Sequence, residues 1–267
     1  AQDLYTADMD TARTEAAVWT GICIALFAAG ALAFAGVCLG HRSGKAVAWC
    51  TALAAILSVG CLIAMLAAGH GALRTLCLCA ALALLVLAVF YGIYFAKMLA
   101  QKRRGIQTRQ IGRRKEKSIH TVEVLMCIAT LGAPIAQLLS IAFGWSYLPA
   151  NTRFTGFCVG ILGDGIFLLS VLCMKDSWRA GIPDKDKTEL VTTGIYRFSR
   201  NPAFLGFDLM YVGVLLLYGN LLTLSFSAFA IVMLHLQILQ EERYLVNTFG
   251  APYQEYCRHV SRYWGRK

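Results

Sequence analysis

A short polar stretch near the end of the chain has residue types that could bind a ligand. Arg200-Asn201-Pro202 stands directly before an apolar run, where Pro202 suits the first turn of a helix and Asn201 suits its cap. Amide groups left free at such a helix start can bind the carboxylate or phosphate of a ligand. The stretch therefore predicts a capped helix start that could hold an anionic group.

A second polar stretch contains a pair of carboxylates at the end of the last apolar run. We expect Glu241 and Glu242 to close that helix, where the helix dipole disfavours negative charge. They then need a compensating cation. A salt bridge to Arg200 or Arg197 would be structural, whereas a cationic ligand would make the pair a binding site, and the residues leave both open.

The elements that must position these residues are membrane helices. Hydrophobic residues make up 58% of the 267 residues and charged residues 15%, against about half and about a quarter in soluble domains. Apolar stretches long enough to cross a bilayer recur along the chain. They predict an all-α polytopic membrane protein with seven spans, near residues 16–40, 46–69, 72–98, 119–144, 153–174, 203–219 and 221–240.

The last two spans are joined by Gly219-Asn220, which predicts a tight turn and hence a C-terminal helical hairpin. With the N-terminus outside and the C-terminus inside, all basic residues except Arg13, Arg74 and Arg153 lie on the inner side. Such an excess of basic residues is typical of the cytoplasmic face. Both polar stretches are then cytoplasmic, at the mouth of the hairpin.

This sidedness accounts for the net charge of +10, so we expect no nucleic-acid partner. The basic loop 101–118 is expected to set the topology and rest on anionic headgroups, and binding of a partner is the alternative. We divide the chain into an N-terminal three-span region, 1–118, and a membrane core with a cytoplasmic tail, 119–267.

Several further residues are expected to serve the helix bundle. Gly156 and Gly160 predict close helix packing, and Asp164 and His235 predict structural hydrogen bonds inside the membrane. The ten cysteines have no metal-ligand spacing, and we expect them to be packing residues and the chain to hold no metal. The aromatic and basic tail predicts either an interfacial segment or a lid over the site, through Tyr253, Tyr256, Tyr263 and Trp264.

The order of motifs in the last third of the chain resembles the isoprenylcysteine carboxyl methyltransferase family, part of a wider group with phospholipid methyltransferases. The motifs run from Leu190-Val191-Thr192-Thr193-Gly194-Ile195-Tyr196 through Arg200-Asn201-Pro202-Ala203-Phe204-Leu205-Gly206 to Glu241-Glu242, Phe249-Gly250, Tyr253 and Tyr256. The resemblance implies a site for S-adenosylmethionine that is not a Rossmann fold. It assigns cofactor binding to Thr188, Glu189, Leu190, Val191, Tyr196, Asn201, Pro202, Ala203, Phe204 and Glu241.

The chain departs from the family pattern at two places. The family's Arg-His-Pro-x-Tyr reads Arg-Asn-Pro-Ala-Phe here, and an asparagine still donates and accepts hydrogen bonds. Where prenylcysteine methyltransferases have an arginine that holds the acceptor carboxylate, this chain has Gln237. A neutral amide cannot form that bidentate ion pair, so prenylcysteine is a poor fit as acceptor.

The resulting hypothesis is an integral membrane methyltransferase. It would transfer the methyl group of S-adenosylmethionine to a lipid-like or amphiphilic acceptor (a carboxylate, an amine or a thiol) at the cytoplasmic face. We expect Gln237 and Arg200 to face the acceptor and Glu242 or Asp208 to deprotonate it where a base is needed. The alternatives are an NADPH-dependent membrane reductase of the sterol reductase type and a scaffold without catalysis.

Overall fold

The computed structural model describes residues 71–106, 108, 117–149, 151–179 and 189–267. The predicted spans 16–40 and 46–69, half of the basic loop 101–118 (residues 107 and 109–116), and Thr188 lie outside the described residues.

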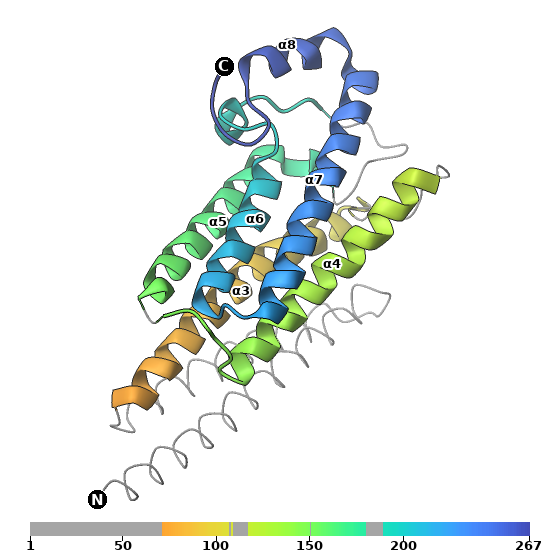
Figure 1. The fold of residues 1–267 in the computed structure, drawn as a ribbon. Helices are drawn as coiled ribbons and strands as arrows, with labels where there is room; N and C mark the ends of the chain where they lie inside the picture. Colours follow the sequence, from red (N-terminus) through yellow and green to blue (C-terminus); the bar gives the residue numbers. More distant parts are fainter. Residues whose placement is uncertain (1–70, 107, 109–116, 150, 180–188) are drawn as a thin grey trace, which may run out of the picture.

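The described part of the chain is a bundle of long helices with a short helix at one end (Figure 1). The long helices are α3 (Gly71–Arg103), α4 (Lys117–Ala142), α5 (Thr152–Met174), α6 (Pro202–Leu217) and α7 (Leu221–Phe249), and the short one is α8 (Ala251–His259). Two 3-10 turns, η1 (Lys175–Ser177) and η2 (Gly194–Arg197), follow α5 and precede α6. The prediction of an α-helical membrane protein is confirmed for these residues.

Four of the helices, α3, α4, α5 and α7, are long and apolar enough to cross a membrane. The fifth, α6, has 16 residues and so spans about 24 Å at 1.5 Å per residue, less than the hydrocarbon core of about 30 Å. The expected span 203–219 is therefore a short helix that ends at Leu217. It leads into the predicted turn, where Asn220 caps α7. Its Oδ1 accepts from Thr223 N (3.0 Å), and its backbone N donates to the hydroxyl oxygen of Thr223 (3.0 Å).

The expectation that Glu241 and Glu242 close the last helix is wrong, because α7 continues to Phe249. The apolar run ends at residue 240, but the residues that follow form helix well and none of them is glycine or proline. The helix ends at Gly250, whose φ of 59° is the left-handed conformation that glycine adopts readily. The two carboxylates thus stand inside a helix, away from its negative end.

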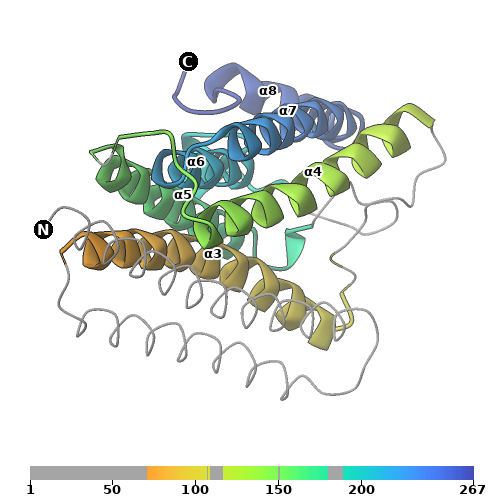
Figure 2. The same cartoon turned by 60° about the horizontal axis from the view of Figure 1, so that its bottom comes forward.

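Glycines let α5 and α6 pack closely side by side (Figure 2). A Cβ atom added to Gly156 would lie 2.7 Å from Gly213 O, and one added to Gly163 would lie 2.8 Å from Gly206 O. The predicted close approach at Gly156 and Gly160 is confirmed, and Gly163 extends it toward the end of the bundle that carries the polar stretches.

This packing gives a test of the fold. Gly163→Ala is expected to lower the midpoint of thermal unfolding in detergent, because backbone atoms of α6 occupy the space of the new methyl group and overpacking costs about 1–3 kcal/mol. Gly165→Ala in the same helix is the matched control, since nothing lies within 4 Å of its added Cβ. Equal midpoints for the two variants would contradict the close approach.

The two polar residues expected to hydrogen-bond inside the membrane behave differently. His235 Nδ1 forms a hydrogen bond with the Tyr263 hydroxyl, as predicted. Both oxygens of Asp164 are buried and have no hydrogen-bond partner among the residues that the structure describes. The predicted bond of Asp164 is therefore not found in this part of the chain.

Candidate methyltransferase site

A pocket opens where the ends of α5 and α7, the segment before α6, and α8 come together. Eight of the residues that the resemblance assigned to the cofactor line it: Glu189, Leu190, Val191, Tyr196, Asn201, Ala203, Phe204 and Glu241. Pro202 begins α6 as predicted but is not in the lining. The two polar stretches, far apart in the sequence, thus form opposite walls of one cavity.

Seven further lining residues were not assigned to the cofactor or the acceptor from the sequence. They come from the segment after α5 and from the far end of α7: Met174, Ser177, Trp178, Arg179, Tyr244, Leu245 and Phe249. Trp178 is buried, packs edge-on against Tyr94 of α3 with ring centroids 5.5 Å apart, and accepts a hydrogen bond at its carbonyl from Gln101 Nε2 (2.9 Å). These contacts fix the segment that carries Ser177 and Arg179 to the side of the pocket.

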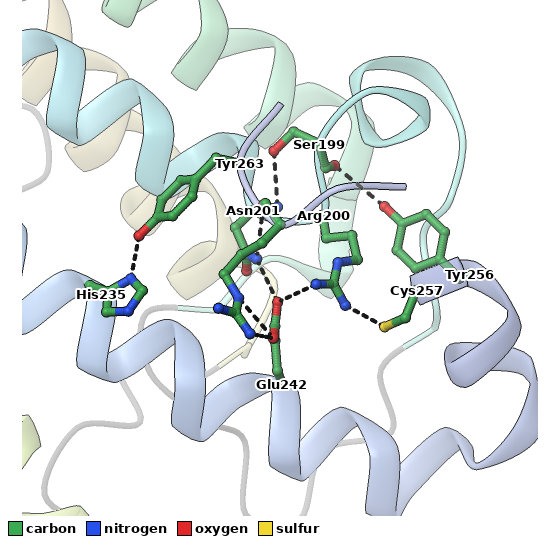
Figure 3. A network of polar contacts seen from close by, with 9 residues as sticks. Ser199, Arg200, Asn201, His235, Glu242, Tyr256, Cys257 and Tyr263 are labelled. Atoms are coloured by element: carbon green, nitrogen blue, oxygen red, sulfur yellow. Dashed lines mark hydrogen bonds and ion pairs between the residues drawn. The ribbon is translucent and has the colours of Figure 1, made fainter. Parts of the chain in front are cut away.

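Glu242 is the centre of a polar network beside the pocket (Figure 3). Its side chain is buried; Arg200 Nη2 lies 3.2 Å from Oε1, and Arg262 donates to Oε2 from Nη2 (2.8 Å) and Nε (3.0 Å). The hydrogen bond to Glu242 raises the pKa of the Arg262 guanidinium. The sequence left open whether the carboxylate pair is neutralised by a salt bridge or by a cationic ligand. Glu242 forms the salt bridge, with Arg200 and also with Arg262. The sequence did not indicate the contact with Arg262.

Asn201 belongs to this network and does not cap α6 through its side chain, contrary to prediction. Its Nδ2 donates to Glu242 Oε1 (3.1 Å) and to the carbonyl of Arg262 (3.2 Å), while its backbone amide donates to Ser199 Oγ (3.1 Å). A cap would need Oδ1 to accept from the first amides of α6, whereas the two bonds of Nδ2 orient the side chain toward Glu242 and the tail. The motif Arg200-Asn201 thus attaches the start of α6 to α7 and to the tail.

The C-terminal tail folds back against the segment that precedes α6. The Tyr256 hydroxyl donates to Tyr196 O (2.6 Å), Arg200 N to Ser261 O (3.1 Å), and Gly265 N to Phe198 O (2.7 Å). Tyr253 and Tyr256 line the pocket. The tail thus folds back onto the site and contributes two tyrosines to its wall.

Burial raises the pKa of three phenols at this wall, those of Tyr196, Tyr253 and Tyr256. They stay protonated at neutral pH, and the Tyr256 hydroxyl donates to Tyr196 O (2.6 Å). Both signs of charge also reach the lining, with Glu189 and Glu241 as carboxylates and Arg179 and Arg200 as guanidinium groups. Such a wall suits a small molecule that carries a cation, an anion and an aromatic ring.

The predicted catalytic and acceptor-binding residues occupy different positions around the pocket. Arg200 lines it, whereas Glu242, Asp208 and Gln237 are not among the lining residues. Asp208 lies one helical turn beyond Phe204 on α6, and its Oδ1 is buried without a hydrogen-bond partner among the described residues. Gln237 lies one turn before Glu241 on α7 and donates from Nε2 to Glu241 Oε1 (3.1 Å).

Comparison with known proteins finds that parts of this chain are similar to methyltransferases. Residues 154–252 match the family model of phospholipid methyltransferases. A protein-S-isoprenylcysteine O-methyltransferase of Schizosaccharomyces pombe is 40% identical over 72 residues, which are 27% of this chain and 30% of that protein. A probable protein-S-isoprenylcysteine O-methyltransferase of Oryza sativa subsp. indica is 32% identical over 112 residues, 40% of this chain and 58% of that protein.

The matched stretches thus cover less than two thirds of either relative. A solved structure of a eukaryotic intramembrane Ras methyltransferase, an isoprenylcysteine carboxyl methyltransferase, aligns with 91% of this chain and over 96% of its own chain. The two are 18% identical in sequence, and the TM-score is 0.44. At that score the overlay adds nothing about the arrangement of the helices. Residues 154–252, which contain most of the motifs and most of the pocket wall, are thus similar to phospholipid methyltransferases, and part of the chain is similar to protein-S-isoprenylcysteine O-methyltransferases.

Proposed function

We propose that this protein is an integral membrane methyltransferase that transfers the methyl group of S-adenosylmethionine to a lipid-like or amphiphilic acceptor. The observation that carries the proposal is the pocket itself, in which the motif residues 189–204 and Glu241 face one another. The names of the relatives support methyl transfer to a membrane-associated, prenylated acceptor as the group's chemistry.

The lining offers groups that fit each part of this cofactor, whose sulfonium supplies an electrophilic methyl group. Glu241 and Glu189 are suited to its positive charges, Arg179 to its carboxylate, and the rings of Phe204, Tyr244 and Phe249 to its adenine. Thr188 and Pro202 remain proposed contacts on the strength of the family resemblance alone.

The main work of the protein would be alignment. Holding donor and acceptor in line can remove up to about 7–11 kcal/mol of the barrier in ideal cases, and a pocket covered by the tail excludes water. Glu242, paired with two arginines, would serve this role by fixing Arg200 and Asn201. Asp208 is the better candidate of the two for a base, because its Oδ1 has no hydrogen-bond partner among the described residues.

The proposed topology keeps seven spans, with the N-terminus outside and the C-terminus inside, so that the site opens to the cytoplasm. Region 1–118 would form a separate N-terminal part, with its basic loop on anionic headgroups. Region 119–267 would form the catalytic core. The acceptor would then enter sideways from the membrane and the cofactor from the cytoplasm.

Calorimetric titration of the purified protein in lipid nanodiscs with S-adenosylmethionine and with NADPH tests the cofactor. The proposal predicts saturable binding of S-adenosylmethionine. Binding of NADPH alone would contradict it and favour a reductase, and binding of neither would favour a scaffold.

A further inference from the structure

We propose that Gln101, in the last turn of α3, is a positioning residue of the cofactor pocket, which it serves by fixing the wall segment 177–179. The inference rests on the proposed binding of S-adenosylmethionine. It adds a residue from outside 154–252, the stretch that the family model matches. Gln101 is fully buried and does not line the pocket, so it acts on the ligand through its neighbours.

Both ends of the Gln101 amide form hydrogen bonds to other segments of the chain. Nε2 donates to the carbonyl of Trp178 (2.9 Å), and Oε1 accepts from the Thr108 hydroxyl (2.7 Å). Turning the amide over would bring its oxygen against the Trp178 carbonyl, so the two partners set which end is nitrogen. The amide thus ties the end of α3 to the segment after α5 and to residue 108.

The Trp178 carbonyl also holds the side chain that we assign to the carboxylate of the cofactor. Arg179 Nη1 donates to the same oxygen (2.9 Å), and both Trp178 and Arg179 line the pocket. A carbonyl oxygen has two lone pairs, so it can accept from Gln101 and from Arg179 at once. Gln101 therefore fixes the peptide group on which the guanidinium of Arg179 rests.

The ring of Trp178 is held by packing in the same place. It is buried edge-on against Tyr94 and Phe167, with ring centroids 5.5 and 6.3 Å apart. Apolar packing has no preferred direction for the peptide, whereas a hydrogen bond at the carbonyl does. The proposal therefore makes α3 part of the site, although the boundary drawn at residue 118 assigns this helix to the N-terminal part.

A second contact joins the same two segments but lies in water. Arg104 Nη1 donates to both carboxylate oxygens of Asp176 (2.8 and 2.9 Å), and these side chains are 64% and 51% exposed. An exposed ion pair of this kind contributes little. Arg104→Gln is therefore a matched control, which removes a link between α3 and η1 without touching the Trp178 carbonyl.

The test is a double-mutant cycle on the affinity for S-adenosylmethionine, measured by calorimetry on the purified protein in nanodiscs. Gln101→Met keeps the length of the side chain and removes the amide, and we expect the Kd to rise by about tenfold. Arg179→Met should raise the Kd at least as much. The double variant should bind no more weakly than Arg179→Met, because Gln101 acts through Arg179. Arg104→Gln should bind like the wild type.

A milder pair of variants changes the same amide from its other end. Thr108→Val removes the hydroxyl that orients Gln101 and should also raise the Kd, whereas Thr108→Ser keeps the hydroxyl and should bind like the wild type.

Three results would overturn the inference and leave the methyl-transfer proposal standing. They are an unchanged Kd in Gln101→Met, losses that add in the double variant, and equal affinities of the two Thr108 variants. A wild-type protein that does not bind S-adenosylmethionine would remove both proposals.

Discussion

Replacing Glu242 with alanine is expected to abolish methyl transfer and to release the C-terminal tail from the bundle. The carboxylate is buried and bonded to Arg200, Arg262 and Asn201, which come from the start of α6 and from the tail. Removing one partner of a buried ion pair costs about 3–5 kcal/mol, because the remaining charges stay buried without compensation. Here Arg200 would be left buried without its partner, whereas Arg262, whose side chain is 38% exposed, would remain partly in water.

The loss can be followed by limited proteolysis. In Glu242→Ala, cleavage after the arginines and lysine of residues 251–267 should become much faster than in the wild type, and binding of S-adenosylmethionine should be lost with it. Glu255→Ala is the control, since Glu255 pairs with Arg258 in an exposed ion pair that contributes little. Wild-type proteolysis and transfer rates in Glu242→Ala would show that the network does not hold the site together.

Glu241→Gln, one residue away, should have a different effect. We expect its dissociation constant for S-adenosylmethionine to rise by about 10–100-fold, or about 1.4–2.8 kcal/mol, with little change in the stability of the free protein. The reason is that Glu241 lines the pocket, whereas the ion pairs with Arg200 and Arg262 are formed by Glu242.

A comparison of two ligands by calorimetry makes this prediction specific to charge. S-adenosylhomocysteine has a neutral sulfur, so its affinity should fall less than that of S-adenosylmethionine when Glu241 becomes glutamine. An unchanged affinity for S-adenosylmethionine would contradict the role of Glu241 as the partner of a cation. The contrast between adjacent residues, one structural and one for binding, follows directly from the faces of α7 on which they stand.

Local signals in the sequence predicted most of the helices. Apolar runs, the Gly219-Asn220 turn and Pro202 at a helix start depend on neighbouring residues, and within the described residues the structure has the helices and the turn that they predict. The predicted end of α7, at residue 240, was too early because hydrophobicity indicates where the membrane ends and not where the helix ends. The helix ends at a residue that can adopt a positive φ. Gly250 was the informative residue.

The site was predictable only in part. The motif order indicated eight of the lining residues, yet the ion pair of Glu242 with Arg262 joins a helix to a tail 20 residues away, and no periodicity or spacing encodes such a contact. The same holds for Trp178 and Arg179, which reach the wall through packing on α3. The orientation of the Gln237 amide depends on Glu241 and could be read only once the two side chains were placed.

The central claim is that one small cationic molecule occupies the pocket between residues 189–204 and the end of α7. Ultraviolet crosslinking of methyl-labelled S-adenosylmethionine to the purified protein in nanodiscs, followed by peptide mapping, tests it most directly. We predict label on peptides from both 189–204 and 241–256, competed away by S-adenosylhomocysteine. Label that does not saturate, or that maps to peptides outside both segments, would contradict it.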